Sequence, residues 1–463
     1  MSRLRAWSPT GTSCTESFVP EHWHLQALND AISSKVLPCS SGIFPVQPED
    51  LVLYYGVEGP NSKGLGRIDF TSHTDEQVRR LAEACDIATF GRGHEDVHDE
   101  SYRKAGKLDK GHFATTFDPE QCGLMHAIRH NILEGHKGKA LKVEMYKLNV
   151  YGTRLTVPCP CLYSQPRALG PGSFFKTHKD TPRADNMIAS LVIVFPTRHE
   201  GGVLALRQEY RKFKFDSGKI ISEARTPSIA YAALYSDVEH EVEPVSSGYR
   251  VTLTYNLYLI DSVARDVPQD TAYELALKAA FDALLRDSSY LPGGGLLGFG
   301  LRHEYPVDLT EIEPKIYTPG YEVPLTPLDQ LLGVLKGSDA ILQKACKDLG
   351  LKANLRILYH GEDREVRMCP GVPPPTTWEH EDGFTFWLEK SAQAKYIVPP
   401  DGQNEGPETE VHWATPMRPV DVKKLSTPYI AFGNNAFMSK IYSTMCLIVE
   451  IGPAYSRVAS GVD

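Results

Sequence analysis

The middle of the chain consists of short apolar stretches separated by glycine, proline and polar residues, a pattern typical of successive β-strands. The barrel is expected to begin near Leu141, and a first strand is expected over Glu144–Tyr151, where polar and apolar residues alternate. Short strands at this spacing favour a double-sheet jelly roll, or double-stranded β-helix, with flanking helices in an α+β chain. The later strands that we predict are Phe174–His178, Ile188–Phe195, Val203–Arg207, Ser228–Leu234, Glu239–Val242 and Arg250–Ile260.

The last predicted strand of this region has one polar and one apolar face. Arg250 and Thr252 begin the polar face, which Thr254 and Asn256 continue, and the residues between them are apolar. In one interpretation the strand lies at a sheet edge, with its polar face in water and Arg250 paired with a surface acid. In the other, the polar face lines a barrel interior, where an arginine can bind a carboxylate through two parallel hydrogen bonds.

Two helices are predicted before these strands. Thr74 and Gln77 fit a capping box for a helix that runs from Thr74 to about Ala88. A second helix is predicted to begin after an N-cap at Asp118 and to end at Gly135. The sequence therefore places helical segments beside the barrel as well as strands within it.

The pattern divides the part of the chain before residue 263 into three regions. Residues 1–50 are mixed and rich in serine and proline, and we expect a partly ordered N-terminal arm. Residues 51–140 are expected to pack on the barrel, and residues 141–262 to form it. Within the barrel, residues 153–169 contain three prolines and show no strand or helix periodicity, so we predict a mobile inserted loop there. Two short strands are expected in the second region, Leu51–Tyr55 and Arg67–Phe70.

Residues 263–463 have a different character and are predicted to form a separate α+β region. An amphipathic helix is expected over Asp270–Leu285, a second helix from Thr326, and a third from Ser338 to Gly350. This region contains no second complete motif, so we expect it to pack against the barrel and to shape the substrate site. The strands predicted in it are Leu355–Tyr359, Phe384–Leu388, Tyr429–Phe432 and Met445–Ile451.

Composition narrows the class of protein. The 463 residues are ordinary in their apolar and charged fractions, and the net charge of -9 argues against nucleic-acid binding as the main function. No apolar run approaches the length of a membrane span, and the N-terminus lacks the apolar core of a signal peptide. Nine scattered cysteines do not suggest a disulfide framework. We therefore expect a cytoplasmic protein in a reducing compartment, with no nucleic-acid or membrane partner.

Candidate metal ligands lie in the predicted barrel. His178 and Asp180 are two residues apart, so on an extended strand they would point to the same face. His240 follows in a later predicted strand. Two histidines and one carboxylate form the facial triad of non-haem Fe(II) oxygenases, which leaves metal positions open for other ligands. Three other His-x-Asp sequences lack this context, namely His73–Asp75, His94–Asp96 and His380–Asp382.

A further element lies downstream of these ligands. Arg250 stands ten residues after His240 and is followed at two residues by Thr252. With the His-x-Asp sequence, this set resembles the 2-oxoglutarate- and Fe(II)-dependent oxygenases, in their prolyl-4-hydroxylase-like branch. The resemblance is strongest over residues 146–258, apart from the predicted insertion. The C-terminal region resembles that of fungal proteins that carry this oxygenase domain.

The resemblance implies an oxidoreductase, a dioxygenase that consumes O2 and 2-oxoglutarate and releases succinate and CO2. It implies oxidation of a substrate C–H bond, with hydroxylation as the default and desaturation or cyclisation as further outcomes. By this resemblance Fe(II) is assigned to His178, Asp180 and His240, and 2-oxoglutarate to Arg250, Thr252 and Tyr151.

Two alternatives from other classes remain open at this stage. One is a cupin-like metal enzyme that does not use 2-oxoglutarate, and the other is a non-catalytic barrel that uses its pocket for binding. The substrate is also open among a small molecule, an amino acid and a peptide. Four residues near the motif are candidate contacts for an anionic or polar substrate, with structural roles as the alternative: Lys147, Asn149, Lys176 and Arg183.

Overall fold

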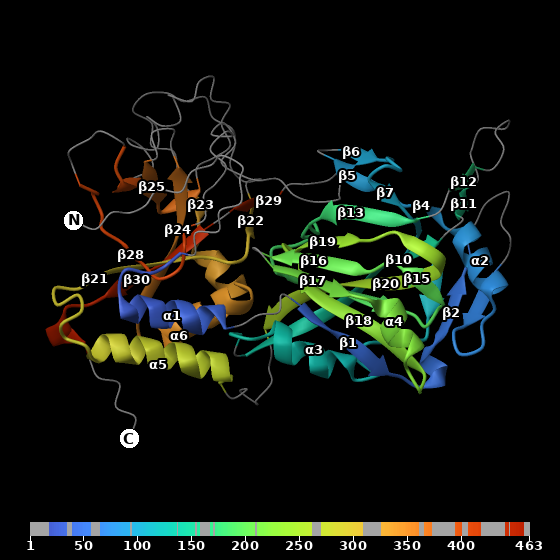
Figure 1. The fold of residues 1–463 in the computed structure, drawn as a ribbon, viewed down its shortest axis with the longest axis horizontal. Coiled ribbons are helices and arrows are strands. Elements are labelled where there is room, and N and C mark those ends of the chain that lie inside the picture. The colour runs from blue at the N-terminus through green and yellow to red at the C-terminus, as the bar shows by residue number, and fades with distance from the viewer. Residues whose placement is uncertain are drawn as a thin grey trace.

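Two β-rich halves lie side by side, each around its own hydrophobic core (Figure 1). The first half holds the predicted barrel strands, and the second holds most of the C-terminal region together with one N-terminal helix. The computed structural model describes residues 18–34, 39–56, 65–92, 95–136, 138–152, 155–157, 167–169, 172–208, 211–261, 270–308, 326–360, 365–372, 394–400, 406–417, 440–443 and 445–457.

The first half is organised around an eight-stranded antiparallel sheet. Its strand order is β1-β18-β14-β20-β10-β8-β4, and β15 also pairs with β20. The long strands β10 and β20 pair along most of their length, so they form the centre of the sheet. The strands are β1 (Cys39–Pro45), β4 (Asp86–Ile87), β8 (Gly106–Asp109), β10 (Lys139–Gly152), β14 (Met187–Val194), β15 (His199–Gly201), β18 (Ser228–Tyr235) and β20 (Val245–Asp261).

A second antiparallel sheet of five strands lies over the first (Figure 1). Its order is β17-β16-β19-β13-β7, and along the chain its strands are interspersed with strands of the first sheet. The predicted bounds of β13 and β19 are confirmed, whereas β20 begins at Val245, five residues before the predicted start. The strands are β7 (Arg103–Lys104), β13 (Phe174–His178), β16 (Leu204–Gln208), β17 (Arg211–Phe215) and β19 (Glu239–Val242).

Strand register sets which side chains meet. His178 on β13 is directly opposite His240 on β19. In the other sheet Tyr151 on β10 is opposite Arg250 on β20, and Asn149 is opposite Thr252. Because side chains alternate between faces along a strand, these pairings bring residues from both sheets towards the space between them.

Of the two helix starts predicted for the first half, one is confirmed and the other is wrong. Helix α2 (Asp75–Ala84) begins with the predicted capping box of Thr74 and Gln77. Helix α3 (Leu124–Ile132) begins after Gly123, so the predicted N-cap at Asp118 is wrong. Gly123 has a φ of 86°, which breaks the helical path. Asp118 instead accepts hydrogen bonds from the two backbone amides that close the preceding turn.

The remaining small elements of this half flank the two sheets. Strands β2 and β3 lie within or close to the two short strands predicted from the sequence, and they pair with each other. The elements are η1 (Pro48–Asp50), β2 (Val52–Tyr55), β3 (Gly66–Asp69), β5 (Phe90–Arg92), β6 (Glu95–Val97), β9 (Phe113–Thr115) and α4 (Ser217–Ser222).

The described part of the predicted N-terminal arm is ordered and packs against both halves. Helix α1 (Trp23–Ser33) buries Leu25 and Leu28 in the core of the second half, where it packs against helix α5 (Ala272–Arg286). Strand β1 forms the edge of the eight-stranded sheet by pairing with β18. Residues 1–17 lie outside the described residues. The described part of this segment therefore contributes to both halves, because distant segments bury residues such as Leu25 and Leu28.

The predicted insertion contains a hairpin. Strands β11 (Leu155–Val157) and β12 (Arg167–Leu169) pair in antiparallel register, so the expectation that residues 153–169 lack strands is wrong. Three-residue strands are too short to give a clear alternation, which explains why the sequence did not indicate them. The mobility of residues 153–169 stays a prediction, and residues 153–154 and 158–166 lie outside the described residues.

The second half contains a six-stranded sheet covered by helices. Its order is β27-β25-β24-β30-β21-β28. The predicted helix from Thr326 is wrong: Thr326 and Pro327 form β23, and a 3-10 helix follows at Asp329–Val334. Predicted strands Phe384–Leu388 and Tyr429–Phe432 lie outside the described residues. The elements are β21 (Gly295–Gly300), β22 (Tyr305–Asp308), β23 (Thr326–Pro327), η2 (Asp329–Val334), α6 (Gly337–Asp348), β24 (Lys352–His360), β25 (Val366–Cys369), β26 (Gly371–Val372), β27 (Lys395–Val398), β28 (His412–Trp413), β29 (Lys440–Ser443), β30 (Met445–Ile451) and η4 (Ala454–Ser456).

The two halves meet closely where α3 ends and α6 begins. Gly135 has a φ of 79°, and a Cβ there would lie 2.5 Å from the carbonyl carbon of Ala340. Nε2 of His136 donates a hydrogen bond to the carbonyl oxygen of Leu335 at 2.7 Å. Position 135 therefore favours glycine for two reasons: the positive φ, and the close approach of the second half, which leaves no room for a Cβ. Within the described residues, no helix has the length and apolar character needed to cross a membrane.

Candidate active site

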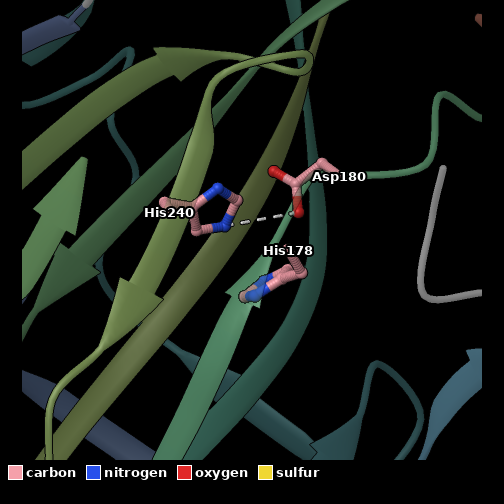
Figure 2. A group of neighbouring side chains, drawn as sticks. All are labelled: His178, Asp180 and His240. Atoms are coloured by element: carbon pink, nitrogen blue, oxygen red, sulfur yellow. Dashed lines mark ion pairs between the residues drawn. The ribbon is translucent and has the colours of Figure 1, made fainter. Parts of the chain in front are cut away.

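The structure brings His178, Asp180 and His240 together at one end of the five-stranded sheet (Figure 2). One potential ligand atom of each residue lies within 4.8 Å of those of the other two. Nε2 of His240 is 3.8 Å from Oδ1 of Asp180, and the two imidazole rings are 4.1 Å apart at their centroids. Among the described residues, this is the one such group of at least three histidines, cysteines or acids.

The position of Asp180 differs from the sequence argument. Strand β13 ends at His178, so Asp180 does not share a strand face with it. Instead, the backbone amide of Asp180 donates a hydrogen bond to the carbonyl oxygen of Ser236 at 3.0 Å. Ser236 immediately follows β18, in the turn that leads to His240. A contact between two loops therefore brings the carboxylate beside the histidine pair.

Both imidazoles are held in the form that binds a metal. Nδ1 of His178 donates to the carbonyl oxygen of Lys176 at 2.7 Å, and Nδ1 of His240 donates to that of Val238 at 2.9 Å. Each contact leaves Nε2 of the ring with a lone pair. Burial, and then the neighbouring His240, lowers the pKa of His178 well below its ordinary value, which favours the neutral ring.

The donor set fits a divalent first-row metal ion. Two neutral imidazole nitrogens and one carboxylate oxygen suit Fe(II), and three protein ligands leave coordination positions for small molecules. The carbonyl contacts of both Nδ1 atoms match the outer-shell support usual for metal-bound histidines. The three residues thus satisfy the chemical requirements of such a site without any rearrangement of tautomers.

A cavity extends from this cluster between the two sheets. Strands β13, β16 and β19 of the five-stranded sheet line it, as do β10, β14 and β20 of the eight-stranded sheet. The polar face of β20 points into it, as shown by Arg250, Thr252, Thr254 and Asn256. Since β20 lies between β14 and β10, the interpretation as a solvent-facing edge strand is wrong.

Arg250 lies at the inner end of the cavity. Its side chain is 1% exposed, and burial lowers its pKa to about 10. Among the described residues, no carboxylate forms an ion pair with it. Thr252 and Tyr151 also line the cavity, and the Arg250 guanidinium carbon is 5.6 Å from the Tyr151 ring centroid. A buried arginine without an acidic partner is costly unless an anion binds there.

Neighbours that the sequence did not indicate fix the orientation of Arg250. Nε of Arg250 donates to Oγ of Ser217 at 3.4 Å, and Ser217 lies 3.3 Å from Nε2 of His199. Gly202 has a φ of 66°, and a Cβ there would lie 2.8 Å from Cδ of Arg250. These contacts join residues from β15, α4 and a tight turn, so no local motif could have revealed them.

The outer part of the cavity carries a group of cations around Tyr146. The Lys147 ammonium is 4.1 Å and the Arg183 guanidinium carbon 4.3 Å from the centre of the Tyr146 ring. Arg103, which the sequence analysis missed, lies over the Phe175 ring. Among the described residues, no carboxylate forms an ion pair with these three cations. These three basic groups therefore face the cavity without a fixed counter-ion.

The four predicted substrate contacts do not all reach this cavity. Lys147, Asn149 and Arg183 line it, whereas Lys176 is exposed to solvent elsewhere. Arg103 adds to the set: its Nη2 donates to Oδ1 of Asn149 at 2.9 Å, and its Nε is buried without a hydrogen-bond partner. Of the other His-x-Asp sequences, His73 lies at the start of α2, and the remaining two fall wholly or partly outside the described residues.

Lys147→Met is expected to stabilise the protein at pH 6 and to have a smaller effect at pH 9. Burial, then Arg103, Lys107 and Arg183, lowers the pKa of Lys147 to about 7 from an ordinary 10.5. Below pH 7 the folded protein therefore contains a partly buried ammonium at a cost in stability. As the pH rises from 7 to 10.5, the unfolded chain binds the additional proton, so this cost disappears.

Thermal unfolding of parent and Lys147→Met at both pH values provides the measurement. Lys142→Met is the control, because Lys142 is an exposed residue on the same strand. An equal stabilisation by Lys147→Met at pH 6 and pH 9 would contradict the assigned environment of Lys147.

Comparison with known proteins agrees with this geometry. Residues 164–258 match the family described as the 2OG-Fe(II) oxygenase superfamily. The chain contains a 2OG-Fe(II) oxygenase domain. The matched segment includes all three residues of the His-Asp-His cluster, as well as Arg250 and Thr252. A search of curated proteins finds no match.

Solved structures similar to this chain include prolyl hydroxylases. A prolyl-4-hydroxylase from Pseudomonas putida is 17% identical, with a TM-score of 0.26, and the match covers 51% of this chain and 98% of that one. A Trichoplax adhaerens prolyl hydroxylase, in complex with a hypoxia inducible factor peptide fragment, is 15% identical with a TM-score of 0.25. That match covers 51% of this chain and 89% of the Trichoplax protein. The viral collagen prolyl hydroxylase of Paramecium Bursaria Chlorella virus-1 is 13% identical with a TM-score of 0.20. That match covers 34% of this chain and 79% of the viral protein.

Proposed function

We propose that the protein is an Fe(II)- and 2-oxoglutarate-dependent dioxygenase that oxidises a C–H bond of its substrate. The observation that carries this proposal is the buried Arg250, which has no acidic partner among the described residues and shares a cavity with the His-Asp-His cluster. A dicarboxylate with one end at a metal and the other at Arg250 accounts for both features. The match of residues 164–258 to the oxygenase superfamily supports the same assignment.

In this proposal His178, Asp180 and His240 hold Fe(II), and Arg250 holds the far carboxylate of 2-oxoglutarate. Bound Fe(II) with 2-oxoglutarate and O2 would supply the chemistry: substrate R–H, 2-oxoglutarate and O2 give R–OH, succinate and CO2. Arg250 contributes a planar pair of donors, and Thr252 a hydroxyl beside it. Tyr151 closes the inner end of the cavity, since its ring faces the guanidinium and is buried.

The arrangement of strands supports a jelly roll as the host of this site. Along the chain from β13 to β20, single strands or pairs of strands from the two antiparallel sheets are interspersed, and the cavity lies between the sheets. The prolyl-4-hydroxylase-like branch and the fungal type remain predictions from the resemblance. Hydroxylation is the default outcome, with desaturation or cyclisation as further outcomes.

Arg250 also favours this function over its rivals. A cupin-like enzyme that does not use 2-oxoglutarate has no need of a buried cation deep in the cavity. A barrel used only for binding has no need of two histidines with lone pairs aligned beside a carboxylate. The combination of both features in one cavity favours the 2-oxoglutarate-dependent enzyme.

We further propose that the substrate carries a carboxylate or another anionic group. On β10, Tyr151 is opposite Arg250 and Lys147 is opposite Thr254. Lys147 therefore lies four residues, or about 13 Å, along the strand from the position opposite Arg250. A co-substrate that reaches Arg250 leaves the outer cations for a second anion. Lys147 and Arg183, which both contact the Tyr146 ring, would then bind the substrate's charged group.

The test is succinate formation from 2-oxoglutarate under air, with Fe(II), in the presence of candidate acids, each beside its neutral carboxamide. The measured product is expected to depend on Fe(II), to be lost in His240→Ala, and to increase with acids but not with the matched amides. Lys147→Met should lower the response to the acids, whereas Lys176→Met should not, because Lys176 is exposed outside the cavity. No Fe(II)-dependent succinate would contradict the function; stimulation by amides alone would contradict only the substrate class.

A further inference from the structure

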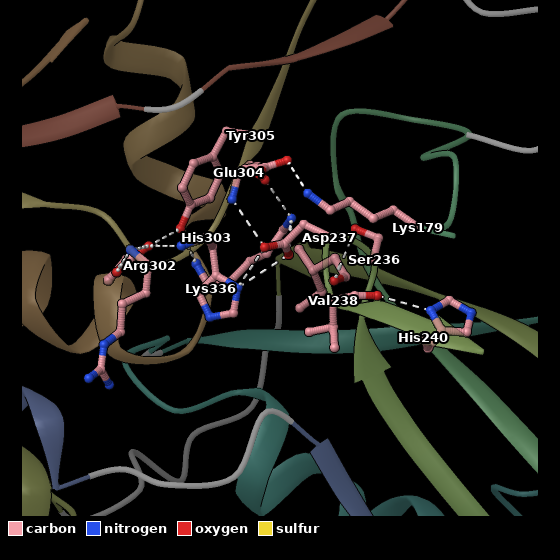
Figure 3. Close-up of polar contacts among 12 residues, drawn as sticks. Lys179, Ser236, Asp237, Val238, His240, Arg302, His303, Glu304, Tyr305 and Lys336 are labelled. Carbon is pink, nitrogen blue, oxygen red and sulfur yellow. Dashed lines mark hydrogen bonds and ion pairs between the residues drawn. The ribbon is translucent and has the colours of Figure 1, made fainter. Parts of the chain in front are cut away.

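Buried polar residues connect the second half of the molecule to the turn that precedes His240 and strand β19 (Figure 3). Asp237 lies in the turn between β18 and β19 and is 7% exposed. Its carboxylate accepts hydrogen bonds from Nδ1 of His303 at 3.0 Å and from Nζ of Lys336 at 2.9 Å. The backbone amide of Glu304 donates to it at 3.1 Å. Three donors from the second half thus hold a carboxylate three residues before a proposed metal ligand.

A second connection reaches the other two proposed ligands. Lys179 stands between His178 and Asp180 in the sequence, and its side chain is 8% exposed. Its ammonium forms an ion pair with Oε2 of Glu304 at 2.7 Å. Glu304 therefore contacts both ligand-bearing segments, one through its side chain and the other through its backbone amide.

The residues that make these contacts are themselves held firmly within the second half. Nζ of Lys336 also donates to the carbonyl oxygen of Glu304 at 2.9 Å. Asp339 at the start of α6 accepts hydrogen bonds from the Tyr305 hydroxyl at 2.8 Å and from the backbone amide of His303 at 2.9 Å. The segment 302–305 and the start of α6 thus form one bonded unit facing the oxygenase domain.

Electrostatics strengthens this connection. Burial alone would raise the pKa of Asp237, but Lys336 and His303 hold it well below its ordinary value, so the carboxylate is charged. A buried ion pair that loses one partner leaves an uncompensated charge, so its geometry is under strong constraint. The two loops therefore cannot shift relative to the second half without breaking buried charge contacts.

We propose that the second half positions the metal ligands, with Glu304 and Lys336 as positioning residues. Lys336 and His303 fix the Asp237 turn and with it His240, while Glu304 fixes Lys179 and with it His178 and Asp180. The hydrogen bond from Asp180 to Ser236 joins the two segments directly. This inference rests on the proposed metal site and assigns the C-terminal region a role in metal binding.

The test is the affinity of the metal-free full chain for Co(II), an air-stable substitute for Fe(II), measured by titration. Glu304→Gln keeps the shape of a side chain that is 18% exposed and removes only its charge. We expect it to bind Co(II) about 10- to 100-fold more weakly, as for other outer-shell changes at metal sites. Lys179→Met should weaken binding similarly, and Lys179→Arg, which keeps the ion pair, should restore it. The visible spectrum of bound Co(II) should change in Glu304→Gln, since the ligand geometry changes.

Lys344→Met provides the matched control. Lys344 is buried in the same half and forms ion pairs with Asp270 at 2.8 Å and Glu274 at 3.2 Å, away from the ligand loops. It should lower the thermal stability while leaving Co(II) affinity and spectrum unchanged. Parent-like affinity in both Glu304→Gln and Lys179→Met, or an equal loss in Lys344→Met, would overturn the positioning role. Failure of the parent to bind Co(II) would instead overturn the metal site itself.

Discussion

Replacing Arg250 by alanine is expected to weaken 2-oxoglutarate binding roughly 30- to several-thousand-fold. The guanidinium is 1% exposed, and no carboxylate among the described residues pairs with it. Loss of one partner from a buried, hydrogen-bonded charge pair costs about 2–5 kcal/mol, which corresponds to that range of affinity. The measurement is titration with 2-oxoglutarate under anaerobic conditions, with Fe(II) loaded.

Substitutions that keep part of the interaction should give graded losses. Arg250→Lys keeps the charge but loses the planar pair of donors, so it should restore binding only in part. Thr252→Val should cost about 1 kcal/mol, because one neutral hydrogen bond is lost. Fe(II) affinity should remain nearly unchanged in all three variants.

Arg367→Ala is the control for the loss of a buried arginine. Arg367 is 4% exposed and contacts Tyr396 in the six-stranded sheet, far from the cavity strands. Its loss should affect stability and leave 2-oxoglutarate affinity intact. Parent-like 2-oxoglutarate binding by Arg250→Ala would show that the co-substrate pocket is wrongly placed, and the metal enzyme without 2-oxoglutarate would become the better assignment.

His178→Ala and His240→Ala are each expected to abolish tight Fe(II) binding. Each change removes an imidazole from a set of three proposed ligands, and two ligands hold a divalent ion poorly. The loss should exceed the 10- to 100-fold typical of changes outside the ligand sphere. Metal analysis after dialysis, together with Co(II) titration, measures the effect.

His24→Ala serves as the comparison for these two variants. His24 is fully buried in the core of the second half and contacts Asp287 at 2.9 Å, so its loss perturbs packing without touching the proposed site. It should retain about one metal ion per chain. Full metal occupancy in His178→Ala would refute the ligand assignment, whatever the result for the control.

The sequence by itself determined the features whose residues lie close together in the chain or follow the periodicity of a single strand. The strands that carry His178 and His240 were predicted with their observed bounds, because each is short, apolar in part and flanked by turn residues. The polar face of β20 was evident from alternation, and its residues Arg250 to Asn256 do line the cavity. The capping box of α2 was likewise predicted, because its partners are three residues apart.

Only the tertiary structure decided contacts between distant segments. In the structure a hydrogen bond to Ser236, and not a shared strand, positions Asp180. The structure also placed Arg103 in the cavity and Ser217 beside Arg250. It also showed that β20 is interior to its sheet, which the alternation of a single strand cannot reveal. The physical reason is that period and spacing report which face of an element is polar, not which other element covers that face.

The same distinction explains why the sequence did not indicate the role proposed for the C-terminal half. Its sequence carries no complete motif of its own, and Glu304 and Lys336 have no local feature that marks them as more than surface charges. Their roles arise because the fold buries them against Lys179 and Asp237, more than 60 residues away in the chain in each case. A buried charge must find its partner in space, so the sequence determined the proposed ligands, while the tertiary structure decided what holds them in place.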